Sequence, residues 1–157
     1  MQKITPFLWF DDNAGEAIDF YTSVFKNSKV INVRKYNNVA AGSKSDVMTG
    51  TIELEGQQFM LLNGGPMFKF TPAISLFINC ETQEEVDYYW DKLSEGGRTD
   101  RCGWLQDKFG LSWQVVPSVL GSLLGNKDAA KAKRAMTAML QMTKLDIAAL
   151  QQAADQE

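Results

Sequence analysis

The side chains that could carry chemistry in this chain are few, because the sequence contains no histidine. Histidine is the usual general base near neutral pH and the commonest ligand of transition metals. Its absence excludes Ser-His-Asp and Cys-His catalysis, and it excludes zinc or iron sites that are held by two or more imidazoles. Any chemistry must therefore rest on carboxylates, lysine, tyrosine, cysteine or a cofactor supplied from outside.

Gln114 is the polar residue whose position suggests a site. The segment "KFGLSWQVVP" predicts a tight turn that leads into a strand, with Gln114 in the middle of that strand. Alternation places Ser112, Gln114 and Val116 on one face and Trp113 and Val115 against a helix. A glutamine amide offers two donors and one acceptor, so it could orient a carbonyl, phosphate or amide of a ligand. The alternative is that it satisfies backbone groups or water in a collapsed barrel, and both interpretations stay open.

Cys102 is the candidate nucleophile. In "RCGWL" it is predicted to share a strand face with Trp104, and the cation of Arg101 beside it could lower the pKa of the thiol. The alternative, which is favoured without a histidine nearby, is a small buried hydrophobic residue. Trp104 is either a stacking wall for a ligand or filling for the core, whereas Trp90 and Trp113 are predicted to be core residues.

The carboxylates give weaker signals. Glu53 and Glu55 share one face of a predicted hairpin strand, where charges commonly face solvent, so we do not expect catalysis by them. Asp107 is predicted to shape the turn into the strand of Gln114.

Composition limits the class of protein. The 157 residues carry a net charge of −3, with 45% hydrophobic and 22% charged residues, which is typical of a soluble globular domain and favours neither nucleic acid nor a membrane as partner. The N-terminal apolar run is too short and too acidic for a signal peptide, and no segment approaches the length of a membrane span. Two cysteines make no disulfide framework, so a reducing, cytoplasmic location is expected.

The pattern of elements occurs twice. A strand over 4–10 precedes a helix over 11–25, with Asp12 or Asn13 placed to cap it, and strands follow over 29–36, 47–56 and 57–63, the last two joined by a turn at Glu55-Gly56. A strand over 73–80, a helix over 82–97 capped by Thr82, one or two short strands within 98–110 and a strand over 112–117 repeat the order. The sequence therefore predicts an α+β protein with two tandem βαβββ modules, at 1–66 and 67–117, that together make one domain over 1–117.

An alignment of the two modules predicts which residues share a face. Aligning the helices at Glu16 and Glu85 superposes Pro6 on Ser75, Leu8 on Phe77 and Phe10 on Asn79, and the last strands then place Met60 on Gln114. From this alignment we expect Pro6, Leu8 and Phe10 to face inward with Ser75, Phe77 and Asn79, and we expect Phe7 and Trp9 to pack against the first helix.

The segment 118–157 is predicted to be a helical extension, with helices over 119–124, 128–142 and 146–154. Its basic residues are expected to form a solvated face. Its methionine stripe is expected to cover apolar surface on its own domain or on a dimer mate, and this extension could also form a lid over a pocket.

Three segments carry a family resemblance: "FLWFDDNAGEAIDFYTSVF", "CGWLQDKFGLSWQVVP" and "AMTAMLQMTKLDIAALQQA". With the repeated βαβββ order, they resemble the PhnB-like family of the vicinal oxygen chelate superfamily, which includes glyoxalases and bleomycin-resistance proteins, and the resemblance extends over the helical extension. It implies a cupped, incompletely closed barrel with the pocket inside, and a homodimer. Many PhnB-like proteins are labelled demethylubiquinone methyltransferases. The glycines of "NGGPMF" run into a proline rather than into a helix, which makes a methyl-donor site there a weak alternative.

The resemblance also implies where a metal would sit in metal-using relatives, namely on the first and last strands of each module. In this chain those positions are Pro6, Met60, Ser75 and Gln114, which lack the anionic or imidazole donors that a divalent cation needs, so we expect no metal and no cofactor. The prediction is a metal-independent pocket that binds or sequesters a small organic molecule, as bleomycin-resistance proteins do. The alternative is an enzyme acting on a small metabolite. The predicted binding residues are Leu8, Phe10, Met60, Ser75, Phe77, Cys102, Trp104 and Gln114.

Overall fold

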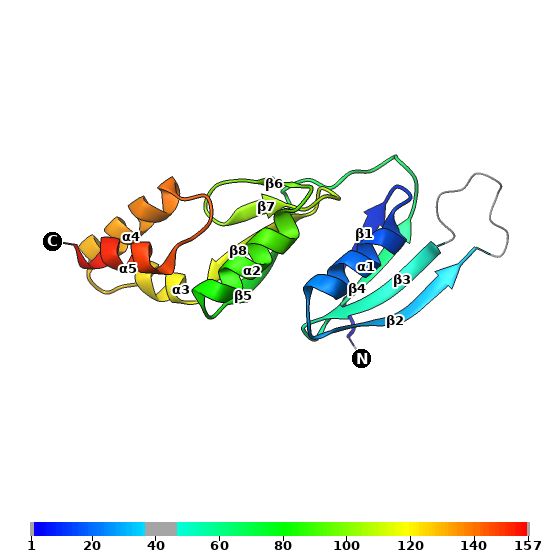
Figure 1. Cartoon of the computed structure of the whole chain (residues 1–157), viewed down its shortest axis with the longest axis horizontal. Coiled ribbons are helices and arrows are strands. Elements are labelled where there is room, and N and C mark those ends of the chain that lie inside the picture. Colours follow the sequence, from blue (N-terminus) through cyan, green and yellow to red (C-terminus); the bar gives the residue numbers. More distant parts are fainter. Residues whose placement is uncertain (1, 37–46, 157) are drawn as a thin grey trace. The chain divides into compact units, whose positions relative to one another are not determined.

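The computed structural model describes residues 2–36 and 47–156. The chain divides into two compact units, Met1–Phe70 and Thr71–Glu157, and in each of them a helix packs beside a four-stranded sheet (Figure 1). Within the described ranges neither sheet closes on itself. The α+β class and the repeated strand-helix-strand order are therefore confirmed, while the finer division at 1–66, 67–117 and 118–157 stays a prediction.

Unit 1 is built on the sheet order β1-β4-β3-β2, in which β1 runs parallel to β4 and the other pairs are antiparallel. Its elements are β1 (Phe7–Phe10), α1 (Ala14–Val24), β2 (Ser28–Lys35), β3 (Val47–Leu54) and β4 (Gln57–Asn63).

The helix of unit 1 packs on the sheet through the predicted apolar stripe. Its buried residues are Ala14, Ala17, Ile18, Tyr21 and Val24. Gly50 of β3 permits this contact, because a Cβ there would lie 2.6 Å from Ile18 Cδ1. Asn13 is the N-cap but its side chain makes no capping bond; instead the side chain of Asn63 accepts from the backbone N–H of Ala14 at 2.8 Å. A residue from β4 thus supplies the cap that the sequence assigned to Asp12 or Asn13.

The turn between β3 and β4 is the predicted one at Glu55-Gly56. Both residues have positive φ, 48° for Glu55 and 83° for Gly56. Two positive values match a type I′ hairpin turn, whose twist suits the two flanking strands.

Unit 2 repeats this architecture with the order β5-β8-β7-β6, in which β5 is parallel to β8. Its elements are β5 (Ser75–Cys80), α2 (Gln83–Ser94), β6 (Arg98–Thr99), β7 (Trp104–Gln106) and β8 (Ser112–Pro117). Buried side chains of the helix and of the sheet form the core of this unit: Val86, Trp90, Leu93, Leu105, Trp113 and Val115. Trp90 and Trp113 are core residues, as predicted.

The cap of α2 is also as predicted. Thr82 Oγ1 accepts from the N–H of Glu85 at 3.2 Å, and the carboxylate of Glu85 returns to accept from the N–H of Glu81 at 2.8 Å. This reciprocal pair satisfies backbone donors at the helix start, as a capping box does.

Three helices follow β8 in unit 2: α3 (Val119–Leu124), α4 (Ala129–Gln141) and α5 (Ile147–Asp155). Their positions match the predicted helices. They enclose an apolar cluster of Val116, Leu120, Leu145 and Leu150, with Met139 and Met142 packed beside it.

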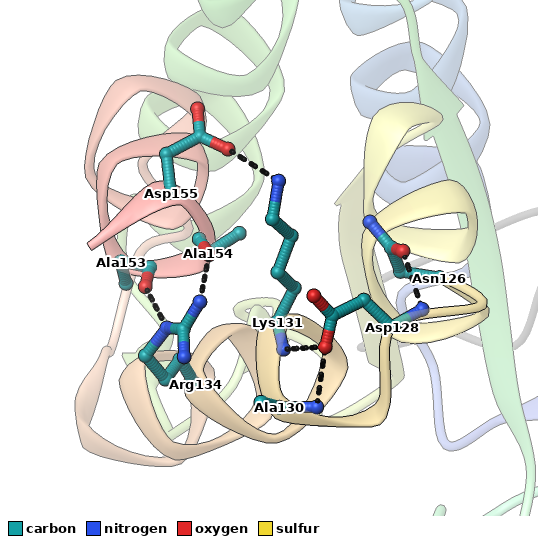
Figure 2. A network of polar contacts seen from close by, with 8 residues as sticks. All are labelled: Asn126, Asp128, Ala130, Lys131, Arg134, Ala153, Ala154 and Asp155. Atoms are coloured by element: carbon teal, nitrogen blue, oxygen red, sulfur yellow. Dashed lines mark hydrogen bonds and ion pairs between the residues drawn. The ribbon is translucent and has the colours of Figure 1, made fainter. Parts of the chain in front are cut away.

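Polar contacts hold these helices to each other. Arg134 of α4 donates to the carbonyl oxygens of Ala153 and Ala154 at the end of α5, at 3.2 and 2.8 Å, and Lys131 lies 3.8 Å from Asp155 (Figure 2). A cation at the carboxyl end of a helix also complements its dipole. Part of the predicted solvated basic face is therefore used for contacts within the group of α3, α4 and α5, which we call the helical lobe.

Gln83 ties the helical lobe to α2. Its amide nitrogen donates to Leu145 O at 3.1 Å and its amide oxygen accepts from Ile147 N at 2.8 Å. Lys144 adds an ion pair to Asp87, with Nζ and Oδ1 2.9 Å apart. The lobe is thus anchored at the start of α5.

Candidate ligand-binding site

Four of the residues predicted for the pocket, Ser75, Phe77, Trp104 and Gln114, share one face of the unit 2 sheet. Strand pairing arranges them and two neighbours in two rows across β5, β8 and β7: Phe77, Gln114 and Trp104 form the first row, and Ser75, Ser112 and Gln106 form the second. Paired residues within a row lie about 5 Å apart, and the two rows are two residues, or about 7 Å, apart along the strands, so a small molecule could touch both rows. We call these six residues the open face of unit 2.

The open face lies opposite the core side of the sheet. Leu105, Trp113 and Val115 point to the core and are at most 3% exposed, whereas Phe77 is 59% exposed and Gln114 and Trp104 are half-buried. The predicted alternation along β5 and β8 is therefore confirmed, except that Val116, which was expected on the pocket face, is covered by the apolar cluster of the C-terminal helices.

Within the described residues, Gln114 makes one side-chain hydrogen bond, in which its Nε2 donates to Ser75 Oγ at 2.9 Å. The two residues sit diagonally across the parallel strands, which a two-residue offset in register permits. The bond orients the amide along the sheet. The partner of the Gln114 amide is therefore a side chain, whereas one of the two interpretations of the sequence expected backbone groups or water.

Ser112, between Ser75 and Gln106 in the second row, has a buried hydroxyl. Its residue is 1% exposed, and in the described part of the chain its Oγ has no hydrogen-bond partner. A buried hydroxyl without a partner is costly and therefore uncommon in folded proteins. The sequence placed Ser112 on this face, but nothing in its local pattern indicated that the hydroxyl would be unpartnered.

Asp107 fixes the turn that leads into β8. Its carboxylate accepts from the backbone N–H groups of Phe109 and Leu111 and from the indole N–H of Trp113. The predicted role of Asp107 is confirmed, and it is structural.

The predicted position of Cys102 was wrong. Cys102 does not share a strand face with Trp104, because it lies before β7 in a turn with φ of 59°. Its N–H donates to Met142 O at 2.9 Å and its thiol approaches Met139 O at 3.6 Å. It contacts the helical lobe, so the structure does not bring it into the rows of the open face.

The predicted facing of Leu8 and Phe10 was also wrong. Leu8 pairs with Leu61, and Leu61 pairs with Gly50, which contacts α1. Leu8 is 8% exposed and Phe10 is 3% exposed. Phe7 pairs with Met60 on the opposite face and is 50% exposed. Leu8 and Phe10 therefore belong to the core of unit 1, and Phe7, which the sequence placed against the helix, takes the outward position beside Met60.

A difference in loop length explains the error. Phe7 pairs with Met60 as Phe77 pairs with Gln114, so the first strands correspond with an offset of 70 residues. The N-caps Asn13 and Thr82 correspond with an offset of 69. The connection from β1 to α1 is therefore one residue longer than the connection from β5 to α2. A slip of one residue in the alignment moves every side chain of the strand to the other face of the sheet.

The glycines of "NGGPMF" support the packing of Trp9. A Cβ on Gly64 would lie 2.4 Å from the Trp9 ring, and the indole N–H of Trp9 donates to Gly65 O at 2.9 Å. Residues 64–74 contain no helix, so this segment lacks the strand-to-helix turn of a nucleotide-type site.

Within the described ranges, 2–36 and 47–156, no group of three or more Cys, Asp or Glu side chains is placed to hold a metal ion. No helix in these ranges is both long and apolar enough to cross a bilayer.

The chain was compared with protein families and with solved structures. Residues 2–116 match the profile of the family described as 3-demethylubiquinone-9 3-methyltransferase. The helical lobe lies beyond this match, although the resemblance noted in the sequence extended over it. A search of curated proteins found no match.

Solved structures share the fold. A PhnB protein from Bacillus cereus is 39% identical, with a TM-score of 0.68 over 74% of this chain and 99% of its own. A Pseudomonas aeruginosa protein has 18% identity and a TM-score of 0.62, over 74% of this chain and 98% of its own. A mutant of the fosfomycin-resistance protein FosX from Listeria monocytogenes, solved with Mn(II), has 17% identity and a TM-score of 0.52, over 72% and 90%.

The two last similarities show the fold alone, whereas the family match and the Bacillus cereus protein show closer kinship. Together with the two open sheets and the repeated βαβββ order, they establish that this chain belongs to the PhnB-like family of the vicinal oxygen chelate superfamily.

Proposed function

We propose that this protein binds a small organic molecule on the open face of unit 2, without a metal ion. The bond between Gln114 and Ser75 carries the proposal, because it holds a polar group in place between two aromatic side chains. Small-molecule sites commonly combine an apolar wall with a few fixed polar groups. Phe77 and Trp104 supply the wall, and Gln114 and Ser75 supply the polar groups.

The side chains at the expected metal-ligand positions support metal independence. FosX is a relative in fold whose structure contains Mn(II). At the positions expected from the resemblance, Met60 pairs with Phe7 instead of Pro6, and Gln114 pairs with Phe77 and bonds to Ser75. Phenylalanine offers no ligand atom, methionine is a soft ligand, and a neutral hydroxyl and a neutral amide are weak ligands of a divalent cation.

Enzymatic activity is the second candidate, because the family profile names a methyltransferase. One observation weighs against methyl transfer in this chain: the glycines after β4 pack against Trp9 instead of opening a helix. A different reaction, with Cys102 as nucleophile, is disfavoured because Cys102 lies in a turn beside α4 and not on the open face. Binding or sequestration is therefore the function that we propose.

A fragment screen by NMR tests the proposal. We expect fragments to shift the side-chain amide resonances of Gln114 and the indole resonance of Trp104. Gln114→Ala should weaken their binding about tenfold, consistent with the loss of one hydrogen bond in a partly buried site. Gln141→Ala, on an exposed residue of α4, is the matched control. A screen in which no fragment moves these resonances contradicts the proposal.

Metal independence needs a separate measurement. Untagged protein, dialysed against a mild chelator, should contain no stoichiometric divalent metal by elemental mass spectrometry. Fragment binding should also be the same with and without added Mn(II). Retained metal at one ion per chain contradicts this part of the proposal.

We also propose a homodimer in the cytoplasm. The edge strand β2 exposes Val30 and Ile31, at 45% and 41%, which a second chain could cover. Both cysteines are free, which suits a reducing compartment. Light scattering after size exclusion should give twice the chain mass, and a monomer at all concentrations contradicts the dimer.

A further inference from the structure

We infer that the open face of unit 2 selects an uncharged ligand with a carbonyl oxygen, which the hydroxyls of Ser75 and Ser112 receive. This inference rests on the proposed function and specifies its ligand class.

The first donor is the hydroxyl of Ser75. Its oxygen already accepts from Gln114 Nε2 at 2.9 Å, so its hydrogen is left to donate. A hydroxyl that accepts one bond and donates another is polarised by both. Ser75 is therefore prepared to donate to an incoming acceptor atom.

The second donor is the hydroxyl of Ser112, which lies next to Ser75 in the paired register of β5 and β8. It is buried and without a partner among the described residues, although buried hydroxyls are normally satisfied. Because Ser112 is only 1% exposed, the atoms that cover its hydroxyl must move aside when a ligand binds, and an acceptor atom that then enters between the two serines completes its hydrogen bonding. A carbonyl oxygen has two lone pairs and can accept from both hydroxyls at once.

The charges around the site favour a neutral acceptor. All six residues of the open face are uncharged. The nearest charge in the second row is Arg98 of β6, which pairs with Gln106 at the far end of the row. Its guanidinium lies 3.5 Å from Asp100, which offsets its charge. Among the described residues of the paired strands β5 to β8, none places an uncompensated cation beside the serines, so a carboxylate or phosphate there would lose its hydration without a compensating charge.

The aromatic residues define the rest of the ligand. Phe77 and Trp104 flank Gln114 in the first row. Their rings offer an apolar surface about 5 Å to either side of the amide, which suits a flat hydrocarbon body. The chemical class is therefore an aromatic or conjugated ketone, ester or amide without charge.

Three probes of one size test this inference by NMR titration: acetophenone, benzoate and ethylbenzene. They share the ring and differ in the group attached to it, which is a neutral carbonyl, a carboxylate or an alkyl chain. We expect acetophenone to shift the resonances of Ser75, Ser112, Gln114 and Trp104 and to bind at least fivefold more tightly than either other probe. Benzoate binding these residues as tightly as acetophenone overturns the inference.

The same titration separates this inference from the proposed function. If acetophenone leaves these resonances unmoved while other fragments shift them, the inference is wrong and the proposed function stands. If no fragment shifts them, both are wrong.

Ser112→Ala gives a test with two readouts. Removing a hydroxyl that lacks a partner should raise the melting temperature of the ligand-free protein by about 2–4 °C. The same change should weaken acetophenone binding about fivefold or more, because one donor is lost. Ser23→Ala, on an exposed hydroxyl of α1 that bonds to Phe20 O, is the matched control. An unchanged affinity of Ser112→Ala for acetophenone overturns the inference.

Discussion

The indole N–H of Trp113 donates to Asp107 Oδ2 across 2.9 Å, inside the core of unit 2. The other carboxylate oxygen accepts from the N–H groups of Phe109 and Leu111 at 2.9 and 3.1 Å. Asp107 is 2% exposed, so these bonds replace water around the carboxylate. They hold the turn that leads into β8, the strand that carries both Ser112 and Gln114.

Asp107→Asn should therefore reduce the free energy of unfolding by about 2–4 kcal/mol, because an amide NH₂ would face donors that now meet a carboxylate. Trp113→Phe removes one of the bonds and should cost less, about 1–2 kcal/mol. Urea denaturation followed by far-ultraviolet circular dichroism measures both. Asp155→Asn, at an exposed ion pair, is the control and should change stability by under about 0.5 kcal/mol. A loss for Asp107→Asn no larger than the control would show that the network is not structural.

Cys80 predicts a dependence of stability on alkaline pH. Burial, with the negative charge of Glu85 as a second cause, raises the pKa of the Cys80 thiol from 9.0 to about 12. The fold thus favours the protonated thiol, so its contribution is complete below pH 9 and is lost as the pH rises from 9 to 12. The loss approaches about 1.4 kcal/mol per pH unit in that window.

Cys80→Ala removes this contribution. The difference in unfolding free energy between the wild type and the variant should shrink from pH 8 to pH 11, as measured by urea denaturation at each pH. Subtracting the variant cancels the titration of lysines and tyrosines, which both proteins share. A difference that stays constant over this range contradicts the assignment.

The opposite facing of Phe7 and Leu8 gives a matched pair of variants. Leu8 is packed between the sheet and α1, so Leu8→Ala should cost about 2–4 kcal/mol of unfolding free energy. Phe7 is half-exposed, so Phe7→Ala should cost about 1 kcal/mol or less, although it removes the larger side chain. Denaturation of the two variants under identical conditions measures the difference. A larger loss of stability in Phe7→Ala than in Leu8→Ala would support the facing predicted from the sequence alignment and contradict the observed one.

The hairpin turn between β3 and β4 offers a stabilising change. Glu55 has a φ of 48°, which asparagine adopts at lower cost than glutamate. Glu55→Asn should therefore raise the free energy of unfolding by about 0.5–1 kcal/mol. Gly56→Ala is the matched opposite, because its φ of 83° strains any side chain even though no atom lies within 4 Å of the new Cβ. Thermal denaturation should move in opposite directions for the two variants, and a shift of the same sign would contradict the type I′ turn.

Gln83 should control the attachment of α5. Gln83→Ala removes the amide that bonds to Leu145 O and Ile147 N, so the start of α5 loses two contacts with α2. We expect amide hydrogens in 147–150 to exchange about tenfold faster, which corresponds to about 1.4 kcal/mol. Gln141→Ala, on an exposed position of α4, should leave this exchange unchanged. Equal protection in Gln83→Ala would mean that the apolar cluster alone holds the helix.

Local sequence pattern determined which elements form. The stripe of Ala14, Ala17, Ile18 and Tyr21, the cap at Thr82, and the turn at Glu55-Gly56 are read from neighbouring residues, because helices and tight turns depend on contacts within a few positions. The face on which Ser75, Phe77 and Gln114 lie could also be predicted, because the alternation in β5 and β8 was assigned in the correct register.

The features that depend on strand pairing could be decided only by the tertiary structure. Strand pairing placed Leu8 opposite Leu61, so the side chains of β1 face the opposite way from the prediction. The loop before α1 is one residue longer than its counterpart, so aligning the helices of the two units does not align their first strands. Pairing of β5 with β8 brought Ser75 to Gln114, although 39 residues separate them. The unpartnered hydroxyl of Ser112 likewise depends on what packs around it and on no neighbour in sequence. Non-local contacts of this kind leave no periodic signal, so the sequence determined the elements and the packing of the strands determined the site.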